Sequence, residues 1–372
     1  MWGVTAVSIA YCSRKVRTEM DDRRIPLMGV LGAFVFAAQM INFTIPVTGS
    51  SGHLGGGLIL SILLGPYAAF LTIASVLFVQ ALFFADGGLL ALGCNIFNLG
   101  FLPAFIAYPL VYRKIAGNAP SPARISAASL AASIVALQLG SFGVVTETVS
   151  SGVSSLPFAT FAFIMQPIHL AIGVVEGLVT ASVISFVYKA KPEIVPTTPE
   201  YRPIGHTRMR NAILGFLAAT LLIGWVVSWF ASDRPDGLEW SIARVTGQRE
   251  LNAPKRGIYN FLALLQDNLS LLPDYSFRKP VRERQVETGI LPAHNLKQHE
   301  RWGSRFGSSI SGIVGGTMTL GLLLIMGFTL KNRKRTVPDI IRADTQDTDL
   351  QQQSSLTAAR ERDIQSARFY EN

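Results

Sequence analysis

The sequence alternates between long apolar runs and short polar stretches, a pattern that predicts a polytopic helical membrane protein. Most of the runs approach or exceed the roughly 20 residues that a helix needs to cross a bilayer. They occupy residues 27–46, 54–85, 89–112, 125–142, 156–188, 212–230 and 310–330, and a shorter run precedes Arg14. We therefore expect an all-α transmembrane helical bundle of about nine segments, one of them a short broken helix.

Four clusters of basic residues lie between these runs and set their direction. The clusters fall at residues 14–24, 113–124, 189–210 and 331–335. If all four face the cytoplasm, as the positive-inside rule favours, an even number of crossings must separate each pair. The run at 54–85 meets this condition only if it breaks at Gly65 and Pro66, where proline removes a backbone donor and glycine loosens the turn.

This break predicts a short helix near 54–64 and a full membrane helix near 67–84. The short helix has about eleven residues, roughly 16 Å at 1.5 Å per residue, and cannot span the bilayer alone. Such a segment is tolerated in a membrane only where protein or a water-lined cavity covers its ends.

The same parity places several polar features together on the outer side of the membrane. They are the start of the chain, His53, Asp86, Glu147 and the segment 231–309. We expect Glu147 on a polar loop between two membrane helices, and 231–309 as an external loop because long loops escape the charge rule. The tail 336–372, which contains QQQSS and scattered charges, is predicted to be disordered in the cytoplasm.

The composition supports a multi-pass membrane protein. Of the 372 residues, 49% are hydrophobic and 15% are charged, which is too apolar for an ordinary soluble domain. The net charge of +9 sits mostly beside the apolar runs, so we expect no nucleic-acid binding. Cys12 and Cys94 lie inside apolar segments and are interpreted as small buried residues, not as a disulfide or a thiolate metal site.

Two motifs that the sequence lacks bear on energy and chemistry. There is no GxxxxGK[ST] phosphate loop, so we expect no ATP hydrolysis by the usual P-loop route. There is also no HExxH motif of a zinc protease, and we predict no enzyme. Any work that the protein performs against a gradient must therefore be powered by a partner or by an ion gradient.

His53 stands in the glycine-rich stretch TGSSGHLGGG, between two apolar runs. Glycine permits backbone conformations closed to other residues and allows a chain or ligand to approach closely. An imidazole near the positive end of a helix stays neutral, and neutral imidazole is the form that binds transition metals. His53 is thus a candidate metal ligand; a solvated histidine on a flexible outer loop is the alternative that the spacing leaves open.

A second polar group follows the next apolar run. Asp86 with its two following glycines predicts a tight outer turn, and Asn95 and Asn98 share one helical face at i and i+3. These amides are expected to orient His53 or to line an access path to it. Contacts between packed helices are the alternative, more so for Asn98.

Two further pairs lie inside predicted membrane helices. His169 and Glu176 are seven residues apart, on a similar face two turns along a helix, where ionisable residues usually mark function. They are candidates for the second shell, the access path or a weaker second metal site, and a structural hydrogen-bonding role is equally open. Ala33 and Ala37, four residues apart, permit the close helix approach that suits docking of another membrane subunit.

Four separated blocks of the sequence together resemble the CbiM/NikM family, the substrate-specific subunits of energy-coupling factor (ECF) transporters for cobalt and nickel. The blocks are MGVLGAFVFAAQMINF, TGSSGHLGGGLILSILLGP, ALFFADGGLLALGCNIFN and HLAIGVVEGLVT. The segment DRPDGLEWSI resembles the PDGLE motif of the small NikN-type accessory subunit, through Pro235, Asp236, Gly237, Leu238 and Glu239. The chain therefore resembles a NikMN fusion.

The resemblance implies an ion site near the outer surface, with Ni2+ or Co2+ as transported substrate and not as cofactor. Its ligands would be the terminal amine and histidine of an N-terminal Met-His pair together with the SGHL histidine, here His53. A planar nitrogen set of this kind suits Ni(II). The implied partners are a transmembrane coupling (T) subunit and ABC-type ATPase subunits, alongside the lipid bilayer. The implied location is the bacterial plasma (inner) membrane.

The resemblance also implies a domain organisation. Residues 1–190 would form the metal-capturing membrane domain, 191–210 a cytoplasmic linker, and 211–335 a two-helix NikN-like unit with an external loop, before the tail 336–372.

The chain departs from the family at its start, where MWGVTAV replaces the usual MHIPDGFL-like opening. Two explanations stay open: the natural start lies upstream, or the chain lacks these ligands. The first is favoured because the apolar run of about 13 residues before Arg14 is too short to cross a bilayer.

We accordingly predict a substrate-binding membrane subunit of an ATP-driven ECF-type importer for Ni2+. The same role for Co2+ is the alternative. A stand-alone channel or secondary carrier is a third hypothesis, which would need a continuous polar pathway or paired intramembrane charges. A metal sensor or structural protein that uses the external loop is the last.

Overall fold

The computed structural model describes residues 1–19, 21, 24–46, 48–118, 120–152, 156–190, 206–232, 234–247, 257–277 and 299–332, except for the side chains of 206–209, 299–305 and 332. These residues are mostly helical, which confirms the predicted all-α class. The predicted tail 336–372 and most of the predicted linker 191–210 lie outside the described residues. Contacts group residues 1–328 into one compact unit, which holds the site described below.

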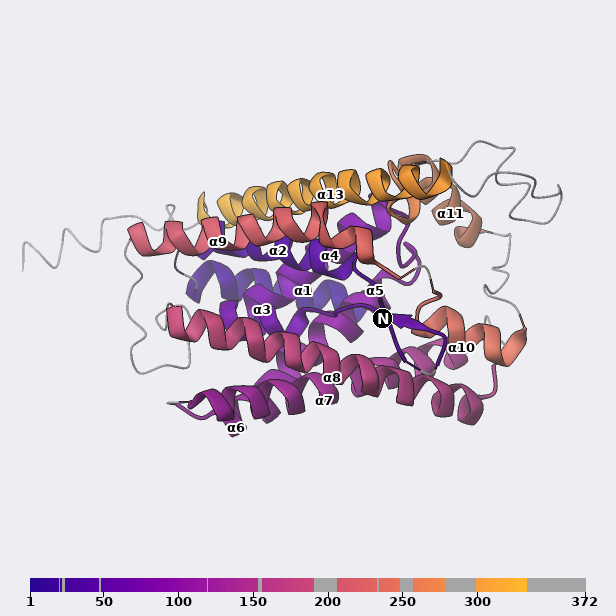
Figure 1. The fold of residues 1–372 in the computed structure, drawn as a ribbon, viewed down its shortest axis with the longest axis horizontal. Coiled ribbons are helices and arrows are strands. Elements are labelled where there is room, and N and C mark those ends of the chain that lie inside the picture. Colours follow the sequence, from indigo (N-terminus) through magenta and orange to yellow (C-terminus); the bar gives the residue numbers. More distant parts are fainter. Residues whose placement is uncertain are drawn as a thin grey trace, which may run out of the picture. The chain divides into compact units, whose positions relative to one another are not determined.

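The first four helices confirm the predicted break in the second apolar run (Figure 1). They are α1 (Trp2–Glu19), α2 (Ile25–Gln39), α3 (Gly57–Leu64) and α4 (Pro66–Phe83). Gly65 separates α3 from α4 with a φ of 81°, a value that favours glycine, and Pro66 begins the next helix. Every residue of α3 is buried, so the protein covers this eight-residue helix on all sides.

The third apolar run forms one continuous helical stretch with an unusual middle. It consists of α5 (Leu92–Ile96), η2 (Phe97–Tyr112) and α6 (Arg113–Ala116), and η2 has the wider hydrogen-bonding pattern of a π-helix. Pro103 and Pro109 lie inside η2, and each lacks a backbone N–H. The sequence pattern predicted a helix here but gave no signal for the wider turn.

The next two helices, α7 (Pro122–Ser150) and α8 (Phe158–Ala190), pack along each other. Gly177 of α8 lies against Leu130 of α7, where a β-carbon would come within 2.7 Å of the leucine Cα. The expectation of a polar loop around Glu147 was wrong, because α7 continues to Ser150 and Glu147 lies in its last turn. No proline interrupts this stretch, and threonine hydroxyls such as Thr146 bond back to the preceding turn.

The C-terminal part consists of two long helices and several short ones. The elements are α9 (His206–Trp225), η4 (Val227–Phe230), α10 (Gly237–Thr246), α11 (Ile258–Leu269), η5 (Pro273–Tyr275) and α13 (His299–Asn332). Figure 1 shows α9 and α13 side by side; both helices contact α2, and small residues allow this packing. A β-carbon on Gly315 would lie 1.9 Å from the Phe36 ring, and one on Gly312 would lie 2.8 Å from Gly224.

A two-stranded hairpin precedes His53, and the sequence analysis did not anticipate it. Strand β1 (Phe43–Thr44) pairs antiparallel with β2 (Ser51–Gly52), with Phe43 opposite Gly52 and Thr44 opposite Ser51. Strands of two residues carry no periodic signal, so their pairing depends on long-range contacts.

Among the described residues, six helices are long and apolar enough to cross a membrane. They cover Pro66–Phe83, Leu92–Ala116, Pro122–Ser150, Phe158–Ala190, Arg210–Phe230 and Phe306–Lys331. The apolar helix α2 is shorter, and α1 and α3 are not among the six. The predicted nine segments therefore include three that do not reach the length and composition of a full span.

Candidate functional site

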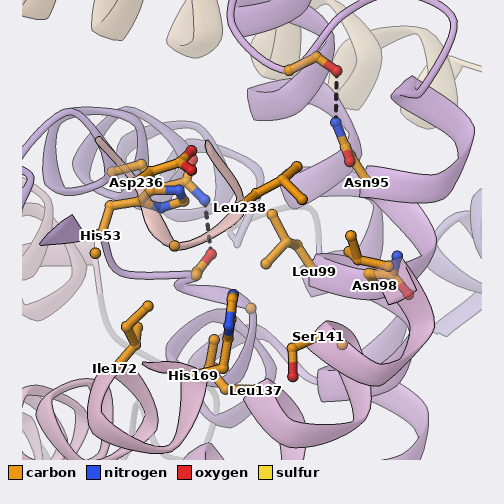
Figure 2. Close-up of a pocket in the computed structure, with 18 of the residues that line it drawn as sticks. His53, Asn95, Asn98, Leu99, Leu137, Ser141, His169, Ile172, Asp236 and Leu238 are labelled. Atoms are coloured by element: carbon orange, nitrogen blue, oxygen red, sulfur yellow. Dashed lines mark hydrogen bonds between the residues drawn. The ribbon is translucent and has the colours of Figure 1, made fainter. Parts of the chain in front are cut away.

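The sequence candidates come together around one cavity of about 190 Å3. The cavity is lined by His53, Asp86, Asn95, Asn98, His169 and Glu176. Three residues of the PDGLE motif, Asp236, Gly237 and Leu238, also line it. Figure 2 shows His53 and Asp236 on one side of this space and the two asparagines on the other. Residues far apart in the sequence thus share one chamber, in which polar side chains lie among apolar ones.

His53 is half-buried and lies four residues before the first residue of α3. Its Nδ1 is 3.2 Å from the Leu54 carbonyl oxygen. In the tautomer that donates to this carbonyl, Nε2 keeps its lone pair for a metal ion. The glycines are needed sterically: Gly56 has a φ of 73°, and a β-carbon on Gly57 would lie 2.3 Å from the Leu99 carbonyl oxygen.

Glu176 of α8 holds the backbone directly after His53. Its carboxylate accepts hydrogen bonds from the Gly55 amide (2.8 Å) and the Gly56 amide (3.1 Å), and the side chain is only 1% exposed. The Gln39 amide of α2 donates to the Gly55 carbonyl at 2.8 Å. The amides before α3 therefore point at Glu176, and His53 lies outside this helix end, contrary to our expectation. Glu176 positions the loop that carries His53.

His169 also lies in the cavity wall, two turns before Glu176 on α8. Its Nδ1 is 2.9 Å from the Met165 carbonyl oxygen, which favours the tautomer with a free Nε2. The PDGLE glycine packs on this ring, since a β-carbon on Gly237 would lie 3.1 Å from His169 Cε1. His169 therefore contacts both the cavity and the C-terminal part of the chain.

The remaining candidates hold the walls of the cavity through hydrogen bonds. Asn95 donates to the Gly87 carbonyl at 2.9 Å and so fixes the glycine turn after α4. Asn98 donates to the Glu147 carboxylate at 2.8 Å, which ties η2 to α7. Asp86 accepts a hydrogen bond from the Tyr275 hydroxyl at 2.5 Å. These hydrogen bonds are consistent with a structural role for the three residues in the cavity wall. Their role in ion access stays a prediction.

The PDGLE motif is bound to the hairpin that precedes His53. The Ser51 amide donates to the Pro235 carbonyl at 2.8 Å, and the Ser51 hydroxyl donates to the Arg234 carbonyl at 2.8 Å. Asp236 caps α10 by accepting from the Glu239 amide at 2.8 Å. The sequence placed the motif on the outer side, but nothing in its pattern showed that it completes the chamber wall.

In the part of the chain that the structure describes, no three side chains of His, Cys, Asp or Glu form a cluster that could hold a metal ion. Both cysteines are free thiols; Cys12 is buried as predicted, whereas Cys94 is only half-buried.

The predicted docking pair on α2 lies inside the protein. Ala33 is 2% exposed and Ala37 is fully buried. Ala33 faces Gly316 of α13, where a β-carbon would lie 3.8 Å from the alanine Cβ. The close approach that we predicted thus occurs within the chain. A subunit that used the same face would have to displace α13, and the subunit contact stays a prediction.

The spans and the chamber between them define a multi-pass protein of the cell membrane. Residues 1–194 match the CbiM family model, described as the cobalt uptake substrate-specific transmembrane region, and residues 210–332 match the PDGLE domain. The chain belongs to the CbiM family, with a PDGLE domain following in the same polypeptide.

Curated relatives include both short and fused proteins. A putative metal transport protein of Haloquadratum walsbyi is 38% identical over 199 residues, 53% of this chain and 87% of that protein. A putative fused nickel transport protein NikMN of Archaeoglobus fulgidus is 29% identical over 331 residues, 89% of this chain and 94% of that protein. The fused nickel transport protein NikMN of Rhodobacter capsulatus is 30% identical over 292 residues, 71% of this chain and 80% of that protein. The chain is therefore a membrane component of nickel or cobalt transport.

Proposed function

We propose that this chain captures Ni2+ from outside the cell as the substrate-binding subunit of an ATP-driven ECF-type importer. The observation that carries the proposal is the chamber in which His53 lies beside the PDGLE motif. Neutral imidazole is a good ligand for nickel, and the loop that carries it is held by Glu176 and Gln39. The name of the Archaeoglobus relative, which aligns over 89% of this chain, supports nickel as the ion.

Cobalt is the second candidate, because the matching family is described by cobalt uptake. Nickel and cobalt both accept nitrogen ligands and stand next to each other in the affinity order of divalent ions. Competition between the two ions for uptake would decide between them.

The proposed energy source is a set of separate ATPase subunits that act through a transmembrane coupling subunit. The sequence lacks a P-loop of its own, which supports this division of labour. Reorientation of the loaded chain would then deliver the ion inward. A stand-alone carrier would instead transport nickel without ATP.

Uptake of radiolabelled nickel into vesicles tests the proposal. With the coupling subunit, the ATPases and ATP present, the natural chain should accumulate nickel and the His53→Ala variant should not. The same change at His294, to which the proposal gives no role, serves as the matched control. Full uptake without ATP would favour a stand-alone carrier, and unchanged uptake by the His53 variant would refute the site.

A further inference from the structure

Helix α11 carries an apolar stripe on its outward face. Ile258, Phe261, Leu265 and Leu269 recur at the spacing of one helical face. They are 62%, 62%, 37% and 38% exposed, and α11 has no buried residue. Asn260, on the opposite face, is exposed as well. A helix that turns its apolar side outward needs an apolar environment there.

Hydrogen bonds fix α11 and the segment after it at the end of a membrane span. The Leu89 amide donates to the Gln266 side-chain oxygen at 3.1 Å. The Leu271 amide donates to the Phe83 carbonyl at 2.8 Å, and the Asp274 amide donates to the Phe84 carbonyl at 2.9 Å. Phe83 is the last residue of α4, so α11 is held at the level where this span leaves the membrane.

The apolar surface continues from α11 toward the next span. Phe277 lies beside α13, because a β-carbon on Gly307 would come within 3.3 Å of the Phe277 amide nitrogen. Phe277 and Phe306 are each 48% exposed, and Ile310 is 36% exposed one turn further along the span of α13. Exposed apolar side chains on a membrane span face lipid, and the stripe of α11 extends this surface at its end.

We infer that α11 is an interfacial helix whose apolar stripe is buried among the acyl chains of the leaflet on the His53 side. Amphipathic helices can lie in the plane of the interface, where they bind through their buried apolar area. The helix holds a single charged residue, Asp267, so its binding should depend little on anionic lipid. The inference goes beyond the proposed transport function and does not depend on the identity of the ion.

Spin labels on the full-length chain test this placement. Phe261→Cys and, as the matched control on the opposite face, Asn260→Cys would be labelled in a chain with Cys12→Ala and Cys94→Ala. In phosphatidylcholine liposomes, oxygen should relax the label at 261 more strongly than a water-soluble chromium complex does. The order should reverse at 260.

Two results would overturn the inference. Equal and high access of the chromium complex to both labels would place the stripe in water. Protection of the label at 261 from both relaxing agents would show that protein, such as a second copy or a coupling subunit, covers the stripe. Adding anionic lipid should leave the 261 values unchanged, and a strong dependence on it would contradict binding through acyl chains.

Discussion

At the scale of single residues, the most informative side chain is Glu176. The buried side chain accepts one hydrogen bond on each carboxyl oxygen from two neighbouring backbone amides, and this fixes the turn because either amide would otherwise be buried without a partner. Its partners, Gly55 and Gly56, follow His53 by two and three residues. The position of the imidazole in the chamber therefore depends on a residue more than 120 positions away.

We predict that Glu176→Gln weakens nickel binding while the chain still folds. The amide keeps the size of the side chain but has only one acceptor oxygen, so one backbone amide loses its partner at a cost of about 1–3 kcal/mol. Calorimetric nickel titration of the purified chain and its thermal unfolding in detergent would measure both effects. Glu176→Asp keeps both carboxyl oxygens on a shorter side chain, so its nickel affinity should lie between those of the natural chain and the Gln variant. An unchanged nickel affinity in the Gln variant would contradict the positioning role.

At the scale of elements, the segment from Leu271 to Ser276 is a strap that joins the C-terminal part of the chain to the turn after α4. Tyr275 stacks on Phe84, with ring centroids 5.3 Å apart, and donates to Asp86. Ala85, Asp274 and Tyr275 all have positive φ values, which are costly for residues other than glycine. The contacts of the strap must offset this local strain.

We predict that Tyr275→Phe loosens the strap while retaining its stacking. The loss of the hydroxyl leaves the Asp86 carboxylate without this donor, so hydrogen exchange at residues 271–276 should accelerate. Tyr259→Phe, on the neighbouring helix α11, is the matched control and should leave this exchange unchanged. Exchange rates in the strap that match the natural chain would show that the hydroxyl contributes nothing.

The same strap should respond to alkaline pH. Burial raises the pKa of the Tyr275 phenol well above its usual value, and the nearby Asp86 carboxylate adds to this shift. The phenol is thus a donor throughout the neutral range. Because the pKa is higher in the folded state, the phenol stabilises the fold at pH values below its pKa in the unfolded chain, near 10. This stabilisation is lost as the pH rises above that value toward the folded pKa. The protection of the strap should therefore stay constant to about pH 9 and fall above it.

The helices and their breaks could largely be predicted from the sequence, whereas the contacts that build the chamber could not. The break at Gly65 and Pro66 was predictable because both residues act on their own backbone. The helical conformation around Glu147 was missed because polar residues imitate a loop, although Asn98 binds this carboxylate inside the protein. The partners of Glu176 and of Ser51 are distant in sequence, and a single sequence carries no signal for such pairs.

At the scale of the whole molecule, α13 is joined to the first part of the chain by close packing against α2. The Phe36 ring lies against Gly315 and the Leu320 side chain lies against Gly29, so each side chain reaches the backbone of the other helix at a glycine. The PDGLE loop adds a second link through the hairpin before His53. The two regions matched by different family models are thus packed together within residues 1–328.

We predict that Gly315→Ala destabilises the protein, because its β-carbon would come within 1.9 Å of the Phe36 ring. Overpacking of this kind costs about 1–3 kcal/mol. Gly321→Ala, in the same helix with no neighbouring atom within 4 Å, is the matched control and should be neutral or mildly stabilising. Thermal unfolding in detergent would measure the stability of both variants. Equal melting temperatures for Gly315→Ala and Gly321→Ala would show that α2 and α13 pack more loosely than described.

The chamber draws its wall from residues as early as Gln39 and as late as Leu238. During synthesis, the ribosome therefore delivers His53 long before the PDGLE residues that face it. Until those residues emerge, the nascent protein carries its imidazole in a chamber with one side open. Because both parts belong to one polypeptide, every copy of the chain receives the PDGLE residues that complete the wall. The ratio of the two parts is therefore always one to one, whereas two separately expressed subunits can differ in amount.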